Sequence, residues 1–479
     1  MNDLLLKDRK DFIILSFIFL IFVFITCYTG QYWFAIIPFG LLLAYYGLFR
    51  FDFVFLILVF SLPWSAEYHF NQNLGTDLPD EPLMILTSSL CLVFFAWNPQ
   101  EARQPLKHPL FLFLMLHFFW ICVTVLFSTG ALVSFKYLFA KGWYIIAFVT
   151  APFFIFRSKT MIKKTAVVFT VSMLIIALIV LVSQYQHHFT FEKVNESVHP
   201  FFRNHVNYSA MLVCTIPIWM AIYQLNKNNK TLRMTLFLTL LILSTAVFLS
   251  YSRGAWLALV IGPGIHWLIR RKLLFISFNV TIIIILIAVF WLKSGERYLQ
   301  YAPDYKKTIF HSNFREHLAA TYQLRDVSTA ERFNRWIAGI KMVSEKPVIG
   351  YGPNTFYNNY KPFTIPVFKT WVSKNEDHST VHNYFLLILV EQGIPGLLLF
   401  IFLTGAMLYY AERLYHRITD PFYSIVSITT GIVVAMILVL NFLSDLIETD
   451  KIGTLFFLCL GTLIMTDLNT RRNMLNVTC

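Results

Sequence analysis

The sequence predicts an all-α polytopic membrane protein with about 12 to 14 transmembrane helices. Composition gives the first indication: of 479 residues, 57% are hydrophobic and only 14% are charged, whereas soluble chains average about 25% charged residues. The net charge of +13 is spread over short connections between apolar runs and does not cover one soluble face. That pattern is typical of membrane topology, and it gives no support for nucleic-acid binding.

A series of about 14 apolar runs gives the second indication, because each is long enough, or nearly so, to cross about 30 Å of hydrocarbon. The runs are 11–28, 32–49, 51–65, 82–97, 109–128, 134–156, 165–184, 206–224, 234–250, 254–269, 273–292, 381–410, 422–442 and 453–467. Of these, 51–65 and 254–269 are the weakest candidates. The first run lacks a small-residue cleavage site and is expected to be a span, not a removable signal peptide.

The third indication is the alternation of charge between successive connections. Lysine and arginine occupy every second connection, from Lys7 before the first run to Arg472 after the last, while the others are acidic or neutral. By the positive-inside rule, both termini are expected in the cytoplasm. The same rule places the longest polar segment, 293–380, in the periplasm.

The expected organisation is therefore one membrane domain in three parts: N-terminal transmembrane helices in 1–292, a large periplasmic loop in 293–380, and three C-terminal transmembrane helices in 381–479. The loop is expected to contain short helices, one over 328–343 and capped by Ser328 or Thr329. A turn-rich break over 346–354 follows. Two further segments, 185–205 and the tight turn 250–254, are expected on the same outer side.

No metal or cofactor site is predicted. The histidines of 185–205, among them His205, lack an i,i+4 spacing with a carboxylate, so interfacial histidines are the favoured interpretation. The glycines at 350 and 352 lack the Gly-Lys-Ser/Thr that completes a phosphate-binding loop. The cysteines fall in apolar runs or at the end of the chain, so no disulfide framework is expected.

Cationic side chains gather on the outer side, where they are normally depleted. Arg253 lies in the tight turn, Arg203 lies just ahead of another span, and Arg332 and Arg335 lie in the loop. A guanidinium offers a planar fork of donors for phosphate oxygens, so these residues are candidates for binding an anionic lipid headgroup. For Arg253, a snorkelling interfacial arginine is an alternative of equal weight.

His382, Gly393 and Gly396 begin the first C-terminal run. If Ser379 or Thr380 caps a helix here, His382 and Gly393 are close to three turns apart and share a face, with Gly396 near the same stripe. A glycine stripe allows a neighbouring helix to pack closely and leaves the histidine in a crowded, water-accessible corner. From spacing alone, a packing seam with an incidental histidine is the simpler alternative.

These motifs resemble those of the O-antigen ligase and polymerase superfamily of integral-membrane glycosyltransferases. The resemblance is carried by His-Asn at 382–383 with its two following glycines, by Ser-Arg-Gly at 252–254, and by the arginine at 332 that leads through Trp336 into 346–352. It covers about 200–470. Before that it rests on the span pattern alone, with about two spans more than the simplest family topology. It implies a GT-C-like membrane fold.

The resemblance also implies a reaction: metal-independent, inverting transfer of a glycan from undecaprenyl pyrophosphate to an acceptor hydroxyl on the periplasmic side of the bacterial inner membrane. In the ligases the acceptor is the lipid A–core oligosaccharide. The partners implied are thus the carrier-linked glycan, a glycan acceptor and membrane lipids. A neutral His382 near a helix N-terminus and arginines, which lower its pKa, then fits a general base. Arg253 and Arg203 fit the departing pyrophosphate. Further candidates are Arg332, Arg335, Asn383 and His205.

Other functions stay open at this point. A polysaccharide polymerase acting on O-antigen or exopolysaccharide, or a protein O-oligosaccharyltransferase of the same superfamily, differs only in its acceptor. A non-enzymatic polysaccharide transporter or flippase would also have many spans. It would be expected to show charged or Gly/Pro-broken helix pairs near mid-membrane in two matching halves, and the sequence shows no such symmetry.

Overall fold

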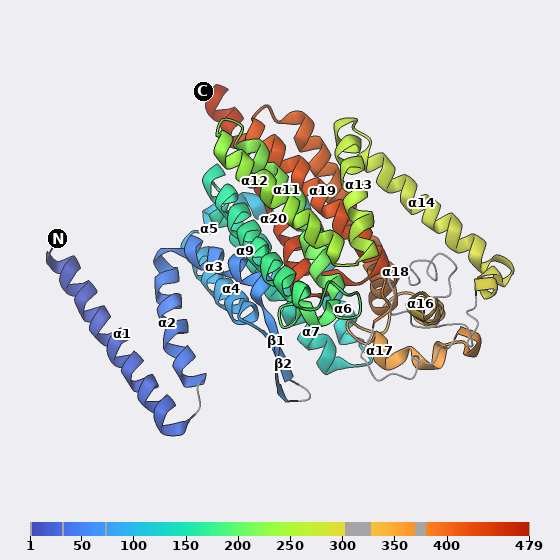
Figure 1. Ribbon diagram of the computed structural model, residues 1–479, viewed down its shortest axis with the longest axis horizontal. Coiled ribbons are helices and arrows are strands. Elements are labelled where there is room, and N and C mark those ends of the chain that lie inside the picture. Colours follow the sequence, from blue (N-terminus) through green and yellow to red (C-terminus); the bar gives the residue numbers. More distant parts are fainter. Residues whose placement is uncertain (1, 31–32, 72–73, 302–326, 369–379, 479) are drawn as a thin grey trace.

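The computed structural model describes residues 2–30, 33–71, 74–301, 327–368 and 380–478 (Figure 1). It is 84% helical with almost no sheet, which confirms the prediction of an all-α polytopic membrane protein. Within the described residues, ten helices are long and apolar enough to cross a membrane, and three more apolar stretches of 10–17 residues lie in the first 64 residues. Each of the predicted apolar runs coincides with a helix.

Fourteen α-helices are found among the described residues before the loop that follows α14. They are α1 (Asn2–Thr29), α2 (Trp33–Phe49), α3 (Phe51–Ser61), α4 (Asp80–Trp97), α5 (Pro99–Leu106), α6 (Pro109–Leu126), α7 (Ala131–Ile145), α8 (Ala151–Ile155), α9 (Lys159–Gln186), α10 (Val194–Val198), α11 (His205–Leu225), α12 (Lys230–Leu249), α13 (Arg253–Arg270) and α14 (Leu274–Lys293). A π-helical turn, Ile146–Thr150, joins α7 to α8. In Figure 1, α1 stands apart from the main bundle and α2 lies at its edge.

The outer loop and the C-terminal part supply the remaining helices, which are α16 (Val327–Glu345), α17 (Phe356–Asn359), α18 (Tyr384–Arg417), α19 (Pro421–Leu443) and α20 (Asp450–Thr478). Short 3₁₀ turns cover Leu62–Trp64, Ser294–Tyr301, Lys361–Phe363, Pro366–Phe368 and Leu446–Glu448. α16 confirms the helix predicted over 328–343. Its start at Val327 places Ser328 and Thr329 inside the first turn, not at the cap.

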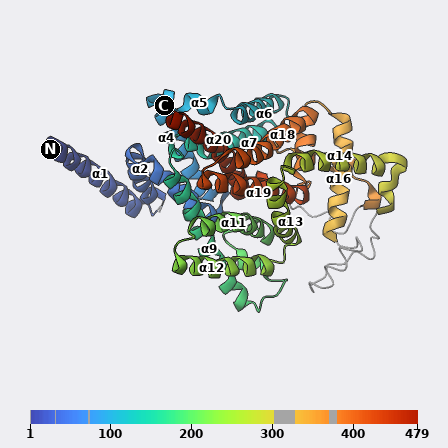
Figure 2. The ribbon, with the colours of Figure 1, turned by 90° about the horizontal axis from the view of Figure 1, so that it is seen from above.

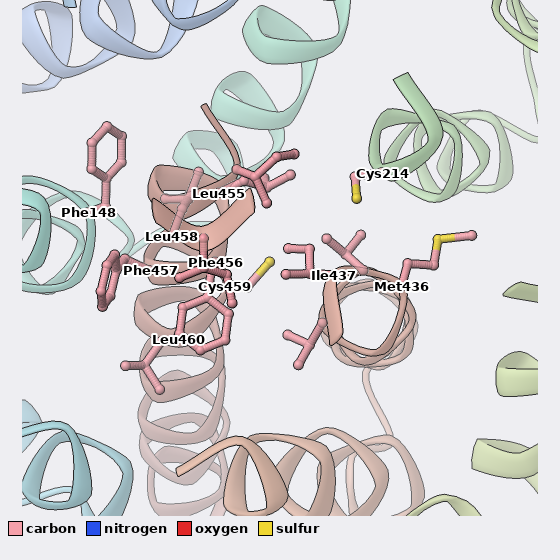
Figure 3. Close-up of a cluster of buried hydrophobic side chains, with 14 of the residues drawn as sticks. Phe148, Cys214, Met436, Ile437, Leu455, Phe456, Phe457, Leu458, Cys459 and Leu460 are labelled. Atoms are coloured by element: carbon pink, nitrogen blue, oxygen red, sulfur yellow. The ribbon is translucent and has the colours of Figure 1, made fainter. Parts of the chain in front are cut away.

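The core of the bundle lies around α20. In its apolar stretch 94% of the residues are buried within the protein, against 6% for α14 at the periphery. Figure 2 shows α20 enclosed by other helices, and in Figure 3 its Phe456, Phe457 and Leu460 lie among apolar side chains. A helix that is apolar all round can lie either in the protein core or against lipid. Packing, and not composition, therefore distinguishes the central α20 from the peripheral α14.

A β-hairpin between α3 and α4 was not predicted from the sequence. Strands β1 (Ala66–Asn71) and β2 (Leu74–Leu78) pair antiparallel, with Ala66 opposite Leu78. We had expected only an acidic connection here. The two strands are too short for their alternation of apolar and polar side chains to be recognised in this polar segment.

The prediction of one continuous helix through His382, Gly393 and Gly396 is wrong. α18 begins at Tyr384, with Asn383 as its N-cap in place of Thr380, so His382 lies outside the helix; Ser379 lies outside the described residues. Gly393 has φ 71° and ψ −174°, a combination that is essentially restricted to glycine. The three residues therefore do not form one helical stripe.

The turn segment 346–354 packs against the break at Gly393 and forms backbone hydrogen bonds with the residues on either side of it. Ile394 N donates to Pro347 O at 2.8 Å, and the carbonyls of Val390 and Glu391 accept from Tyr351 N and Gly352 N. A Cβ on Gly393 would lie 2.0 Å from Val348 O. Gly393 thus allows contact with loop backbone and not with a neighbouring helix. Gly396 does lie against a helix, since its Cβ would be 3.3 Å from Trp120 of α6.

Candidate active site

The start of α18 is fixed to the outer end of α19. The Asn383 side chain caps α18 by accepting from Leu386 N at 3.0 Å, and its amide donates to Phe442 O at 3.1 Å. Tyr384 N donates to Ser444 O at 3.0 Å. Because Asn383 uses both ends of its amide, it holds the residue before it, His382, over the last turn of α19.

His382 takes a left-handed conformation with φ 53°, which is uncommon for a residue other than glycine. Its Nδ1 lies 3.9 Å from Asp445 Oδ1, and about a third of the side chain, 34%, is exposed. Asp445 Oδ2 accepts from the hydroxyl of Thr380 at 2.5 Å. The imidazole therefore has its Nδ1 edge towards a carboxylate and its Nε2 on the opposite side of the ring.

α16 brings two arginines to the same place. Arg335 Nη1 donates to Thr380 O at 3.0 Å, and Trp336 Nε1 donates to Val381 O at 3.0 Å, so α16 is attached to the residues just before His382. Arg335 also lies 3.6 Å from Glu331. Desolvation, followed by the charges of Arg335 and Arg332, lowers the pKa of His382 to about 3.

The direction of this shift agrees with the sequence-based expectation, but its leading cause does not. The sequence suggests a helix N-terminus and nearby arginines as the causes, whereas desolvation by burial contributes most and the arginine charges follow. At neutral pH the imidazole is therefore uncharged and able to accept a proton.

The tight turn predicted over 250–254 is shorter in the structure: Tyr251 has φ 56°, and Arg253 is already the first residue of α13. A Cβ on Gly254 would lie 3.8 Å from Leu440 and from Leu443, which places this helix start against the last turns of α19. Arg253 is half-buried. Arg253, at the start of α13, and His382, in the segment just before α18, thus approach the same end of α19.

Arg203 and His205 lie at the same end of the bundle but in a separate group. Arg203 is 73% exposed at its side chain and lies 3.6 Å from Glu67 of the hairpin. His205 contacts Asn195, with 2.7 Å between Nδ1 and Oδ1. The segment 189–205 reaches the Arg253 turn through Tyr251, whose hydroxyl donates to Phe189 O at 2.5 Å.

The sequence had placed Asp445 only in an acidic connection and had not linked it to His382. The available signal was its position directly after α19 on the outer side. A buried network beneath it holds this connection: Glu448 accepts from Tyr137 and pairs with Lys141, each at 3.1 Å, and Lys141 also donates to Ile447 O. These contacts fix the backbone that carries Asp445.

Glu391 was also missed, because it looked like a lone acid inside an apolar run. Glu391 is 4% exposed, and its carboxylate accepts from Asn354 N, Thr355 N and Phe356 N at 2.8–3.0 Å. It thereby satisfies backbone donors at and just before the start of α17. Within the described residues, no group of three His, Cys, Asp or Glu side chains is arranged to hold a metal ion.

Comparison with known protein families adds an independent finding. The site belongs to a multi-pass membrane protein with a histidine and several arginines at one end of its bundle. Residues 238–401 match the family model described as O-Antigen ligase. This match supports the O-antigen ligase superfamily and confirms the resemblance seen in the motifs.

The matched segment is about a third of the chain. It contains Arg253, α16 and the first turns of α18 with His382, and it excludes Arg203, His205 and Asp445. Members of the family are glycosyltransferase-like ligases and polymerases, which supports an enzyme. No curated protein matches the chain.

Proposed function

We propose that the protein transfers a glycan from undecaprenyl pyrophosphate to an acceptor hydroxyl, with lipid A–core oligosaccharide as the acceptor. The observation that carries this proposal is an uncharged histidine held among arginines at one end of a membrane bundle. Neutral imidazole suits proton removal, and guanidinium groups suit pyrophosphate. The family match adds support for this class of substrate.

In the proposed reaction, Nε2 of His382 takes the proton of the acceptor hydroxyl as its oxygen attacks the anomeric carbon. The bond from that carbon to the pyrophosphate oxygen breaks, and undecaprenyl pyrophosphate leaves. A single displacement of this kind inverts the anomeric configuration. Asp445 stabilises the imidazolium through Nδ1, and their 3.9 Å separation can shorten when the ring becomes charged.

Arg253, Arg332 and Arg335 have the complementary task of stabilising negative charge as it develops on the leaving group. Arg203 pairs with Glu67 of the β-hairpin and lies apart from the other arginines. We therefore assign it to an outer part of the same anion-binding region. Since pyrophosphate is already a good leaving group, cationic stabilisation suffices. The purified enzyme is therefore expected to keep its transfer rate in excess chelator, and loss of activity that added magnesium or manganese restores would contradict this.

Donor binding is also expected to change the pKa of His382. In the free protein the arginine charges contribute to the low pKa of His382. A bound pyrophosphate offsets those charges, so the pKa of the imidazole rises towards its ordinary value of about 6.5. His382 thus becomes a stronger base when the donor is in place, which couples proton removal to donor binding.

The acceptor is tested by the lipid-linked species that accumulate in a strain lacking this protein. A ligase deletion leaves full-length polymer on the carrier. Accumulation of single repeat units would instead indicate a polymerase, and glycan retained on the cytoplasmic leaflet would indicate a flippase. A protein acceptor would be seen as loss of glycoprotein with lipopolysaccharide unchanged.

A further inference from the structure

An apolar cleft lies in the half of the bundle farthest from His382. It is formed by the start of α9, the end of α11, the start of α19 and the middle of α20 (Figures 1 and 2). On α19 its lining extends from Phe422 to Val433, a rise of about 16 Å at 1.5 Å per residue. That is roughly half of the 30 Å hydrocarbon core of a bilayer, so the cleft has the depth of one leaflet.

The lining is apolar even at three of its four threonines. Thr165, Thr430 and Thr462 donate their hydroxyls to the carbonyls of Met161, Val426 and Leu458 in their own helices, at 2.7–2.9 Å. A threonine bonded in this way leaves mainly its methyl group for a ligand. Figure 3 shows Leu455 and Cys459, which also line the cleft, extending from α20 towards α19 and α11. The cleft therefore suits a hydrocarbon chain better than a polar molecule.

Lys163 is the charged residue among those that line the cleft, and it lies one turn into α9 at the mouth. Its Nζ donates to Asn226 Oδ1 at 3.2 Å, and an ammonium group has three N–H donors. Nearby Lys159 is already paired with Asp420 and lies over the ring of Tyr423. Lys163 is thus the cation placed to bind an anion at the end of the apolar lining.

We propose that this cleft binds one acyl chain of an anionic glycerophospholipid, with the headgroup phosphate at Lys163. The cleft holds about 750 Å³ of space between atoms, counting its open mouth and the solvent there. An apolar hollow inside a bilayer does not retain water, because water finds no polar partners there. The acyl chain fills the apolar part of the cleft, and Lys163 favours an anionic headgroup.

The test uses the purified full chain in phosphatidylcholine nanodiscs that contain a phosphatidylglycerol with a photoactivatable group midway along one acyl chain. Mass spectrometry then maps the cross-links. We expect adducts on the facing sides of α9, α11, α19 and α20, with unlabelled phosphatidylglycerol competing several-fold better than phosphatidylcholine. Lys163→Gln should make the two competitors equal, whereas Lys164→Gln, next in sequence but exposed and outside the lining, should leave the preference unchanged.

Substitutions that fill the cleft provide a second test of lipid binding. Ala166→Trp, or the milder Ala221→Leu on the facing helix, should remove most adducts, while Leu178→Trp on the lipid-facing side of α9 should not. Adducts that persist in the filled variants, or phosphatidylcholine competing as well as phosphatidylglycerol, would overturn the proposal. Stronger competition by undecaprenyl phosphate would assign the cleft to the tail of the carrier instead.

Discussion

His382 combines a low pKa with partial exposure, and these two properties together determine how its activity should depend on pH. Desolvation and the neighbouring arginines lower the pKa of the free protein to about 3. The acid limb of kcat/KM, which reports the free enzyme, should therefore lie well below pH 6.5. The limb of kcat should lie higher, because bound pyrophosphate offsets the arginine charges in the donor complex.

Arg335→Gln tests this electrostatic account. Removing one positive charge should raise the pKa of His382, so the acid limb of kcat/KM should move upward, but only part of the way because desolvation is the larger cause. The measurement is the transfer rate against pH at low donor concentration. His382→Gln serves as the reference, with a loss of about 10²–10⁴-fold at pH values above the acid limb, since an amide cannot take up the proton. An active Gln variant would exclude the base role, and a wild-type limb already near 6.5 would contradict the lowered pKa of His382.

Arg253→Ala should reduce the transfer rate by about 10²–10³-fold, as expected when a donor to a developing negative charge is removed. Arg253→Lys should recover little, because a point charge does not replace a bidentate fork. The matched control is Arg270→Ala at the opposite, exposed end of the same helix, which should keep its activity. If Arg253→Ala folds normally and transfers at the wild-type rate, Arg253 is only an interfacial residue.

The sequence indicated His382, Arg253 and the α16 arginines as candidates, because short motifs carry those residues. It was not sufficient to find Asp445 or to separate Arg203 from Arg253. Asp445 lies near His382 because hydrogen bonds at Asn383 and Ser444 join the start of α18 to the end of α19. Such a contact between residues more than 60 positions apart leaves no local pattern in the chain.

At the level of elements, the helices were predictable because each contains a long apolar run, whereas the break in α18 was not. The run around Gly393 looks continuous, and Pro395 is compatible with the first turn of a new helix. Only the structure shows that the carbonyls freed by the break accept hydrogen bonds from Tyr351 and Gly352. The outer segment and α18 therefore behave as one unit, with Glu391 joining α17 to it.

Gly393→Ala should disrupt that unit. A side chain at φ 71° and ψ −174° is strained by about 1–3 kcal/mol, and its Cβ would overlap the carbonyl of Val348. We expect a melting temperature lower by several degrees and faster proteolysis of the outer segment at Lys346. Gly264→Ala in α13, where a Cβ meets nothing within 4 Å, should change neither measurement. Equal behaviour of the two variants would show that the break is not required.

At the level of the whole molecule, the distribution of charge over the two ends of the bundle predicts its orientation. The end opposite to His382 carries the basic clusters at the start of α9, at the junction of α13 and α14, and at the end of α20. The positive-inside rule places those clusters in the cytoplasm. The proposed active site then faces the periplasm, the side on which the acceptor hydroxyl is expected.

Cysteine labelling in intact spheroplasts tests this orientation with Lys361→Cys in the outer segment and Lys230→Cys at the start of α12, both exposed but at opposite ends of the bundle. A membrane-impermeant maleimide should label the first variant directly and the second only after lysis. The parent chain is labelled in parallel to set the background, because its six cysteines include the exposed Cys27 and the partly buried Cys122. The reverse pattern would place His382 in the cytoplasm, where the proposed transfer could not reach a periplasmic acceptor.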